Sequence, residues 1–149
     1  MRAAQPIVNI SAKTEYACIA VLELAARHDA GEPVRIRDIA EAHGIPSRFL
    51  VQILLQLKSA GLVQSVRGAS GGYNLAREPE EITLLDVMTV VDAQLGHPTT
   101  SATRNTTTTR VLQRTWKEVA AKERELLDGV TFAGLVERLK GAPEGMYYI

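Results

Sequence analysis

A short basic segment with closely spaced glycines is the part of this sequence best suited to bind a ligand. Residues 62–77 read Leu-Val-Gln-Ser-Val-Arg-Gly-Ala-Ser-Gly-Gly-Tyr-Asn-Leu-Ala-Arg, so two short strand patterns flank a glycine-rich turn. Glycine tolerates positive φ and lets the backbone pass close to a phosphate. Arg67 stands at the tip of this expected hairpin, and its permanent charge suits a phosphate or a narrow minor groove. The segment therefore predicts a β-hairpin that contacts DNA.

A helix-turn-helix pattern directly precedes the hairpin. Residues 36–42 predict a short helix that ends near Gly44, and residues 47–60 predict a further helix with Ser47 as its N-cap. Two helices joined by a short turn with glycine are typical of a helix-turn-helix. The residues of the second helix expected to face inward are Phe49, Leu50, Ile53, Leu54 and Leu57. A helix-turn-helix followed by a basic hairpin is the order of a winged helix, which predicts a DNA-binding transcriptional regulator.

The other elements that must position this unit are expected to be mostly helical. Residues 11–28 predict a largely buried first helix capped by Ser11, and residues 33–35 predict a short strand. After the hairpin, the predicted elements are a helix over roughly 84–92 capped by Thr83, a polar Thr-rich loop at 93–109, a long helix at 110–127 and a last short helix capped by Thr131. The expected fold class is mainly α with one small β-hairpin.

Composition and charge agree with this interpretation. The apolar fraction of 46% is enough for a core, and the formal net charge is zero. Residues 1–77 nevertheless hold nine Lys or Arg against six Asp or Glu, and the acid-free window between Glu41 and Glu78 carries Arg48, Lys58, Arg67 and Arg77. A basic front half fits a DNA-binding face. The sequence shows no signal-peptide pattern and no apolar run long enough to span a bilayer, so we expect a cytoplasmic protein without a membrane segment.

The same residues carry a resemblance to a known family. The matching segments are Ile10 to Lys13, Tyr16-Ala17, Ile39 to Glu41, Gly44 to Pro46, Phe49-Leu50, Ile53-Leu54, Leu57-Lys58, Ala60 to Val63, Ser65 to Tyr73, Leu75, Ile82-Thr83, Asp86-Val87, Trp116 and Val130 to Leu135. In this order they resemble the Rrf-two family of bacterial winged-helix regulators, whose members include IscR, NsrR and CymR. The resemblance covers residues 10–92 almost continuously.

What the resemblance implies is a homodimer that binds a pseudo-palindromic operator in double-stranded DNA, and we expect it to act as a repressor. It places a winged helix-turn-helix domain at 1–80. Residues 81–149 would hold a linker helix, the Thr-rich loop (93–109), a dimerisation helix (110–127) and a C-terminal segment. The implied DNA-binding residues are Ser47, Arg48, Val51, Gln52, Gln56 and Lys58 on the recognition helix 47–60, and Ser65, Arg67, Gly68, Ser70, Gly71 and Gly72 on the wing, with Arg67 in the minor groove. The implied dimerisation residues are Val111, Leu112, Thr115, Trp116, Val119, Leu126 and Leu127.

Two departures from the family pattern are visible. Some members have Glu at the position of Val51, and a valine offers a base edge only an apolar contact, as with a thymine methyl. Several members hold an iron–sulfur cluster on three cysteines in the loop before the long helix, whereas residues 95–110 contain no cysteine and His97 is their one soft-metal ligand. We therefore expect no cofactor. The Thr-rich loop is interpreted as a degenerated cluster loop, a docking surface or a phosphorylation target.

Several alternatives remain open from the sequence. A winged helix can serve as a protein-interaction module, and the effector can be a partner protein or a small molecule bound between the first helix, the helix at 84–92 and the long helix. Cys18, the one cysteine, is either a redox switch or, as we favour, a small buried hydrophobe. His28, His43 and His97 do not suggest a zinc site, and no phosphate loop or catalytic spacing indicates an enzyme.

Overall fold

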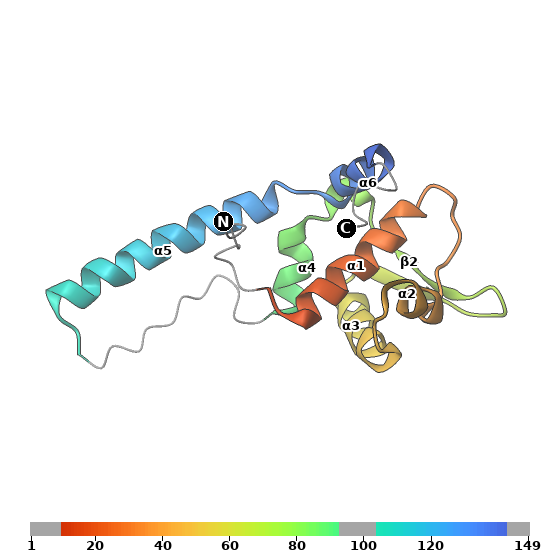
Figure 1. Cartoon of the computed structure of the whole chain (residues 1–149), viewed down its shortest axis with the longest axis horizontal. Coiled ribbons are helices and arrows are strands. Elements are labelled where there is room, and N and C mark those ends of the chain that lie inside the picture. Colours follow the sequence, from red (N-terminus) through yellow and green to blue (C-terminus); the bar gives the residue numbers. More distant parts are fainter. Residues whose placement is uncertain (1–9, 93–103, 143–149) are drawn as a thin grey trace, which may run out of the picture.

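Six α-helices, one 3-10 helix and one antiparallel hairpin make up the computed structural model, which describes residues 10–92 and 104–142 (Figure 1). In chain order the elements are α1 (Ala12–Ala26), α2 (Ile36–His43), α3 (Ser47–Ser59), β1 (Val63–Val66), β2 (Gly72–Leu75), η1 (Pro79–Glu81), α4 (Leu84–Val91), α5 (Thr107–Asp128) and α6 (Phe132–Gly141). The predicted fold class, mainly α with a small hairpin, is confirmed.

Side-chain caps fix the start of three predicted helices. The Ser11 hydroxyl accepts a hydrogen bond from the Thr14 amide at 3.1 Å, and the Thr131 hydroxyl accepts one from the Gly134 amide at 3.0 Å. Thr83 forms a reciprocal capping box with Asp86, in which each side chain accepts from the backbone amide of the other residue. Each cap satisfies an amide that has no partner within its helix, a contribution of about 1 kcal/mol.

The start of α3 differs from the prediction. Ser47 is the first helical residue, and Pro46 occupies the N-cap position without a side-chain cap hydrogen bond. The ring of Pro46 fixes its φ, here −61°, and its carbonyl accepts from the Phe49 amide at 3.0 Å, so the chain enters the helix directly. The expectation that Ser47 caps this helix was wrong.

The long helix also begins earlier than expected. Thr107 to Thr109 form its first turn, because Thr106 and Thr109 make a capping box of the same kind as Thr83 and Asp86. The predicted loop at 93–109 is therefore wrong over its last residues. Its remaining part, 93–103, lies outside the described residues.

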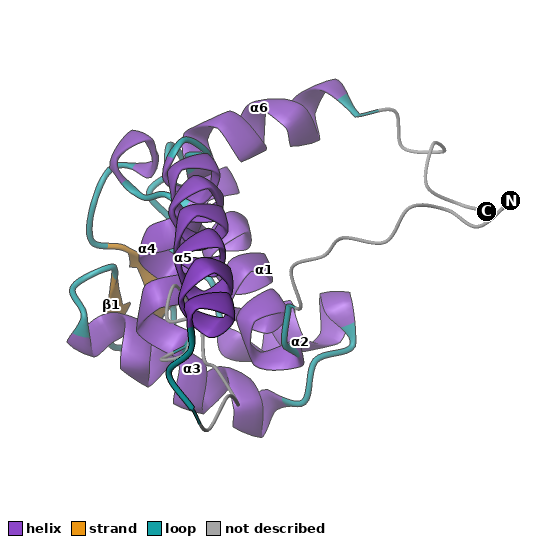
Figure 2. Ribbon diagram, turned by 90° about the vertical axis from the view of Figure 1, so that its left-hand side faces the viewer, coloured by secondary structure: helices purple, strands orange, loops and turns teal. Residues whose placement is uncertain are grey.

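One hydrophobic core holds α1 against α3, α4, α6 and the hairpin. Its fully buried members include Leu24 of α1, Leu54 of α3, Val87 of α4 and Phe132 of α6. α3 and α6 lie on opposite sides of this body (Figure 2). Because α6 contributes Phe132 to the same core, the C-terminal segment is packed onto the winged helix, and the division of the chain at residue 80 stays a prediction.

α5 extends away from this body as a straight arm (Figure 1). None of its residues, 107–128, is buried, and it packs only lightly against α4. Its C-terminal end is tied to the body by two hydrogen bonds, from the Leu84 amide to the Val130 carbonyl and from the Phe132 amide to the Ile82 carbonyl, both 2.9 Å. Within the described ranges, no helix combines the length and apolar character that crossing a membrane requires.

Candidate nucleic-acid interface

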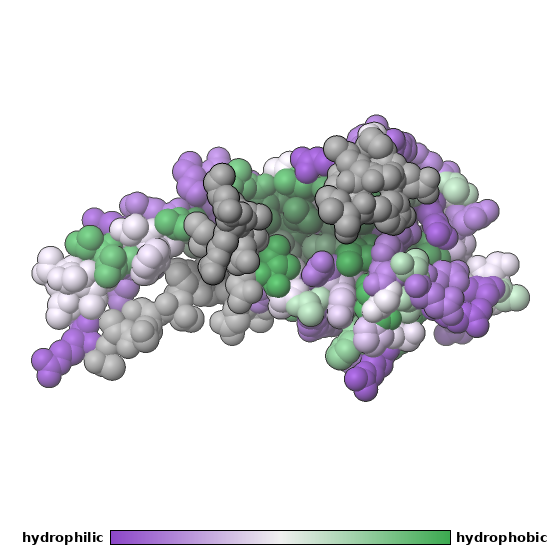
Figure 3. All heavy atoms as spheres, in the orientation of Figure 1, coloured by the Kyte–Doolittle hydropathy of each residue, from purple (hydrophilic) through white to green (hydrophobic). Residues whose placement is uncertain are grey.

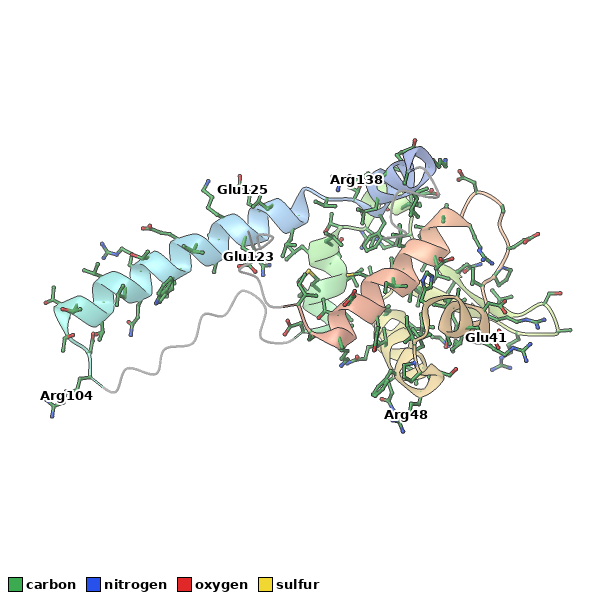
Figure 4. The ribbon with its side chains drawn as sticks, in the orientation of Figure 1. Glu41, Arg48, Arg104, Glu123, Glu125 and Arg138 are labelled. Atoms are coloured by element: carbon green, nitrogen blue, oxygen red, sulfur yellow. The ribbon has the colours of Figure 1, made fainter. Side chains whose placement is uncertain are left out.

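α3 presents a mixed polar and basic face to solvent. Leu50, Ile53, Leu54 and Leu57 are buried on its inner side. Each of the six residues predicted to contact DNA from this helix is exposed: Ser47, Arg48, Val51, Gln52, Gln56 and Lys58. Arg48 points outward from the body at the start of the helix (Figure 4). The residue types on this face can donate and accept hydrogen bonds at base edges and phosphates.

Phe49 does not face inward as predicted, since 45% of it is exposed. Its ring lies at the edge of the core beside Tyr16, with 6.4 Å between the ring centroids. The guanidinium carbon of Arg48 lies 5.1 Å from the centroid of the same ring. Such a cation–π contact at an exposed site contributes about 0.5–1 kcal/mol and limits the orientations of the arginine. Phe49 therefore acts as a support for Arg48 rather than as a core residue.

A side-chain hydrogen bond connects α3 to the wing. The Lys58 ammonium donates to the Ser65 hydroxyl of β1 at 2.9 Å. The sequence predicted both residues as DNA contacts but not that they meet. The bond brings the C-terminal end of α3 and the first wing strand into one exposed surface, and both side chains remain accessible there.

The wing is a four-residue ladder with a basic, glycine-rich tip. β1 pairs antiparallel with β2, with Val63 opposite Leu75 and Val66 opposite Gly72. Arg67, Gly68 and Ser70 at the tip are exposed, like Ser65, whereas Gly71 and Gly72 are half-buried. Gly68 has a φ of 109°, a conformation that other residues rarely adopt. The hairpin thus places Arg67 at the outer end of the molecule.

The base of the wing is fastened to the segment before α2. Val34 and Tyr73 exchange two backbone hydrogen bonds of 2.8 Å, so the strand predicted at 33–35 is reduced to a single bridge. A Cβ atom at Gly72 would lie 2.5 Å from the Val34 carbonyl oxygen. Only glycine permits this close approach of two backbones, which explains its place at the start of β2.

Arg35 contacts the wing, which the sequence analysis did not predict. It occupies the N-cap position of α2 but makes no cap hydrogen bond. Its guanidinium instead donates to the Ala69 carbonyl at the wing tip. A cation is unfavourable at a helix N-terminus, where Ser, Thr, Asp or Asn is preferred. That local mismatch is the sequence signal that could have pointed to a distant partner.

The basic surface differs in membership from the one predicted. Arg77 was counted with it, but it donates to the Glu81 carbonyl at 3.0 Å and lies 4.0 Å from the Glu81 carboxylate. Two other arginines are exposed and take its place: Arg35, which contacts the wing tip, and Arg37 in the first turn of α2. Glu41, labelled in Figure 4, and Asp38 are exposed acids on the same helix. We call Arg35, Arg37, Arg48, Lys58 and Arg67 the basic surface.

Leu55 is a second residue that the sequence reasoning missed. It is 51% exposed, and it lies seven residues after Arg48 and three after Gln52, which places it on the outward face of α3. Val51, one turn earlier, is 41% exposed. An apolar pair therefore lies among the polar residues of the outward face of α3. A leucine next to a buried leucine in a helix is ordinarily interpreted as a core residue, which is why this placement was not predicted.

The residues predicted for dimerisation form an apolar stripe along α5. Val111, Leu112, Trp116, Val119 and Leu126 are all exposed, as is Thr115, whereas Leu127 is half-buried. Figure 3 shows apolar side chains along this helix between polar ones. Large apolar side chains exposed together on one helix indicate an association surface.

Comparison with known proteins places the chain in a family. Residues 10–138 match the profile of the Rrf2 family, described as "Iron-dependent Transcriptional regulator". The transcriptional regulator CymR of Bacillus subtilis is 33% identical over 143 residues, covering 95% of this chain and all of CymR. The regulator IscR of Aliivibrio salmonicida is 34% identical over 131 residues, covering 87% of this chain and 77% of that protein.

Solved structures give the same result. The structure of CymR from B. subtilis, described as its global cysteine regulator, superposes with a TM-score of 0.76 at 31% identity. That match covers 89% of this chain and 98% of CymR. IscR of T. potens superposes with a TM-score of 0.73 at 32% identity, covering 96% of this chain and 98% of that chain.

The donor groups of this chain do not fit a cluster of the kind an iron-dependent family implies. Iron–sulfur clusters are held chiefly by cysteine thiolates, and the mixed types still need two. Cys18 is the only cysteine of the sequence, and it lies on α1. Burial, with a smaller effect from the Glu15 carboxylate, raises the pKa of its thiol to about 11, which disfavours the thiolate that a metal requires. In residues 10–92 and 104–142, no three His, Cys, Asp or Glu side chains come together as a metal site.

The fold and both comparisons agree on the relationship. The family profile spans residues 10–138, and the matches cover all of the B. subtilis CymR sequence and 77% of the A. salmonicida IscR sequence. The agreement extends over most of the chain rather than over an isolated motif. The chain therefore belongs to the Rrf2 family of transcriptional regulators.

Proposed function

We propose that this protein is a homodimeric, sequence-specific DNA-binding repressor that works without an iron–sulfur cluster and has no enzymatic activity. The observation that carries the proposal is the exposed recognition face of α3 joined to the basic wing through Lys58 and Ser65. α3 would lie in the major groove. Arg67 would reach the adjacent minor groove, and the other members of the basic surface would contact phosphates.

The stripe on α5 supports the dimer. It leaves a tryptophan and four aliphatic side chains in contact with water in the single protomer, and a two-fold partner would bury them. Two α3 helices related by this axis would then meet half-sites about one helical turn apart or a multiple of it, roughly 34–36 Å per turn. A pseudo-palindromic operator follows from this symmetry.

Repression would follow from occupancy of the operator, which blocks the approach of polymerase. With a single cysteine of raised pKa, the signal would enter through a partner protein or a small molecule rather than through a cluster.

A second candidate function is a protein-interaction module. It is favoured by the apolar residues Val51 and Leu55 on the outward face of α3, since exposed apolar pairs also mark protein interfaces. DNA is the better fit, because Arg48 and Lys58 on the same helix and Arg67 on the wing are exposed cations suited to a phosphate backbone.

The deciding experiment is a fluorescence-anisotropy titration with DNA from upstream of the protein's own gene at several salt concentrations. We expect tight binding that resists random competitor DNA, and an affinity that falls steeply with salt as counterions are released. Binding no tighter than to random DNA, with a shallow salt slope, would reject the operator and favour the protein-interaction module. A run-off transcription assay on a bound promoter then distinguishes repression from activation.

A further inference from the structure

The outward face of α3 combines polar residues with an apolar pair that the fold itself does not use. Leu50, Ile53, Leu54 and Leu57 already fill the core side of the helix. Val51 and Leu55 lie on the other side with 41% and 51% of their surface exposed. The exposed parts of these two side chains add nothing to the apolar burial of the protomer, and they are available for an apolar contact outside it.

The edges of the bases in the major groove offer one kind of apolar group. Guanine, cytosine and adenine present only hydrogen-bond donors and acceptors there, whereas thymine adds a C5 methyl group. A valine and a leucine cannot form hydrogen bonds with the polar edges, and placing them against those edges would leave the base atoms without partners. The chemistry of the pair therefore selects thymine.

The neighbouring side chains point to the same base pair. Gln52 lies between Val51 and Leu55 along the outward face, and Gln56 follows one turn later. A glutamine side chain pairs with N6 and N7 of adenine, the partner of thymine. None of the ten residues of α3 from 48 to 57 has a carboxylate, the group that typically accepts from a cytosine amine.

We propose that Leu55, together with Val51, is a specificity-determining contact that reads the C5 methyl group of thymine in each operator half-site. This inference rests on the proposed function, because it requires α3 to lie in the major groove. The two side chains stand one helical turn apart, about 6 Å along the axis, and successive base pairs are about 3.4 Å apart. The apolar pair thus spans one or two consecutive A·T pairs. Arg48 lies at the N-terminal end of the same helix.

The test compares thymine with uracil, which differs from it only by the missing methyl group. Duplexes that bind the wild-type protein are first selected from a randomised library. They are then amplified once with thymidine triphosphate and once with deoxyuridine triphosphate. Anisotropy titrations of both pools are then run with the wild type, Leu55→Ala and Leu139→Ala. Leu139 lies on α6 and is also 51% exposed, so it is a matched control away from the recognition face.

For the wild type we expect the uracil pool to bind more weakly by about fourfold for each methyl group that is contacted, the effect of burying one such group. Leu139→Ala should keep this ratio. In Leu55→Ala the ratio should fall by about fourfold for each methyl group that Leu55 contacts, because thymine binding weakens while uracil binding changes little. Any penalty that Val51 contributes should remain. Thermal unfolding of the two variants should match the wild type, since both side chains are half exposed.

Two results would overturn the inference while leaving the proposed function intact. Equal wild-type affinity for the thymine and uracil pools would show that no methyl group is contacted. A uracil penalty that persists unchanged in Leu55→Ala would mean that the methyl group acts through DNA shape. If no selected thymine pool binds better than random DNA, the proposed function itself fails, and Val51 and Leu55 belong to a protein-docking face.

Discussion

Replacing Trp116 tests whether the stripe on α5 joins two protomers. The side chain is 51% exposed, and none of the residues of its helix is buried in the protomer. A tryptophan buries 150–250 Å² when fully enclosed, so roughly 100 Å² remains to be covered in each protomer. A two-fold interface uses the residue twice, which doubles the area to about 200 Å².

At about 25 cal/mol per Å², this area corresponds to up to about 5 kcal/mol for each dimer. Alanine retains part of the contact, and roughly 3–5 kcal/mol is therefore the expected loss in Trp116→Ala. The dissociation constant of the dimer should rise from a hundredfold to several thousandfold. Sedimentation velocity over a dilution series measures this constant directly.

The matched control is Lys117→Ala, which alters the opposite side of the same exposed helix and should leave the dissociation constant within a few-fold of the wild type. Circular dichroism at low concentration should be the same for all three proteins, because Trp116 stabilises no contact within the protomer core. A wild type that stays monomeric at tens of micromolar, or a Trp116→Ala protein that dimerises normally, would refute the assignment of the stripe.

The remaining predictions concern the wing and the cysteine. Arg67→Ala should weaken operator binding by about 1–3 kcal/mol and lower its salt dependence. Arg77→Ala should change operator binding little, because the Arg77 guanidinium of the wild type is already bound to Glu81. Anisotropy at several salt concentrations measures both variants, and equal losses of affinity would contradict a special role of the wing tip. Arg35→Ala should speed hydrogen exchange of the backbone amides at residues 67–71 about fivefold, as expected for the loss of a hydrogen bond worth about 1 kcal/mol. Arg37→Ala should leave this exchange unchanged. Unchanged exchange in Arg35→Ala would show that the Arg35–Ala69 hydrogen bond does not hold the wing tip. Since the pKa of Cys18 is raised from 9.0 to about 11, its thiolate forms only as the pH approaches 11, and alkylation of the folded protein at pH 8 should be about a hundredfold slower than in urea. Cys18→Ser should likewise leave DNA affinity and any peroxide response unchanged, and a lost peroxide response would reveal a redox switch.

The sequence was informative where structure depends on neighbours a few residues away. Ser11, Thr83 and Thr131 were recognised as caps because a cap bonds to an amide three residues further on. Gly44 was recognised as the end of α2, where it adopts a left-handed conformation. The local errors, at Ser47 and at the start of α5, came from Pro46 and from a threonine pair whose capping was not anticipated.

Contacts between distant residues could not be read in the same way. The Arg35–Ala69 bond joins residues 34 positions apart, and the Lys58–Ser65 bond depends on the angle between α3 and the wing. Arg77 is bound to Glu81, so it does not belong to the basic surface, although the count of charges along the sequence had included it. Charge along a sequence measures how many cations are available, while packing decides which of them face outward.

Residue identity and local backbone preference account for the types and order of the elements, for the glycine-tipped wing and for the lack of cysteines for a cluster, and all of these can be read from the chain alone. Which apolar side chains remain exposed once the core is full depends on how the helices pack against one another. Leu54 and Leu55 are the same residue type at adjacent positions, yet one is fully buried and the other 51% exposed. Successive residues of a helix are separated by about 100°, so the orientation of α3 on α1 turns one leucine into the core and its neighbour toward the proposed operator.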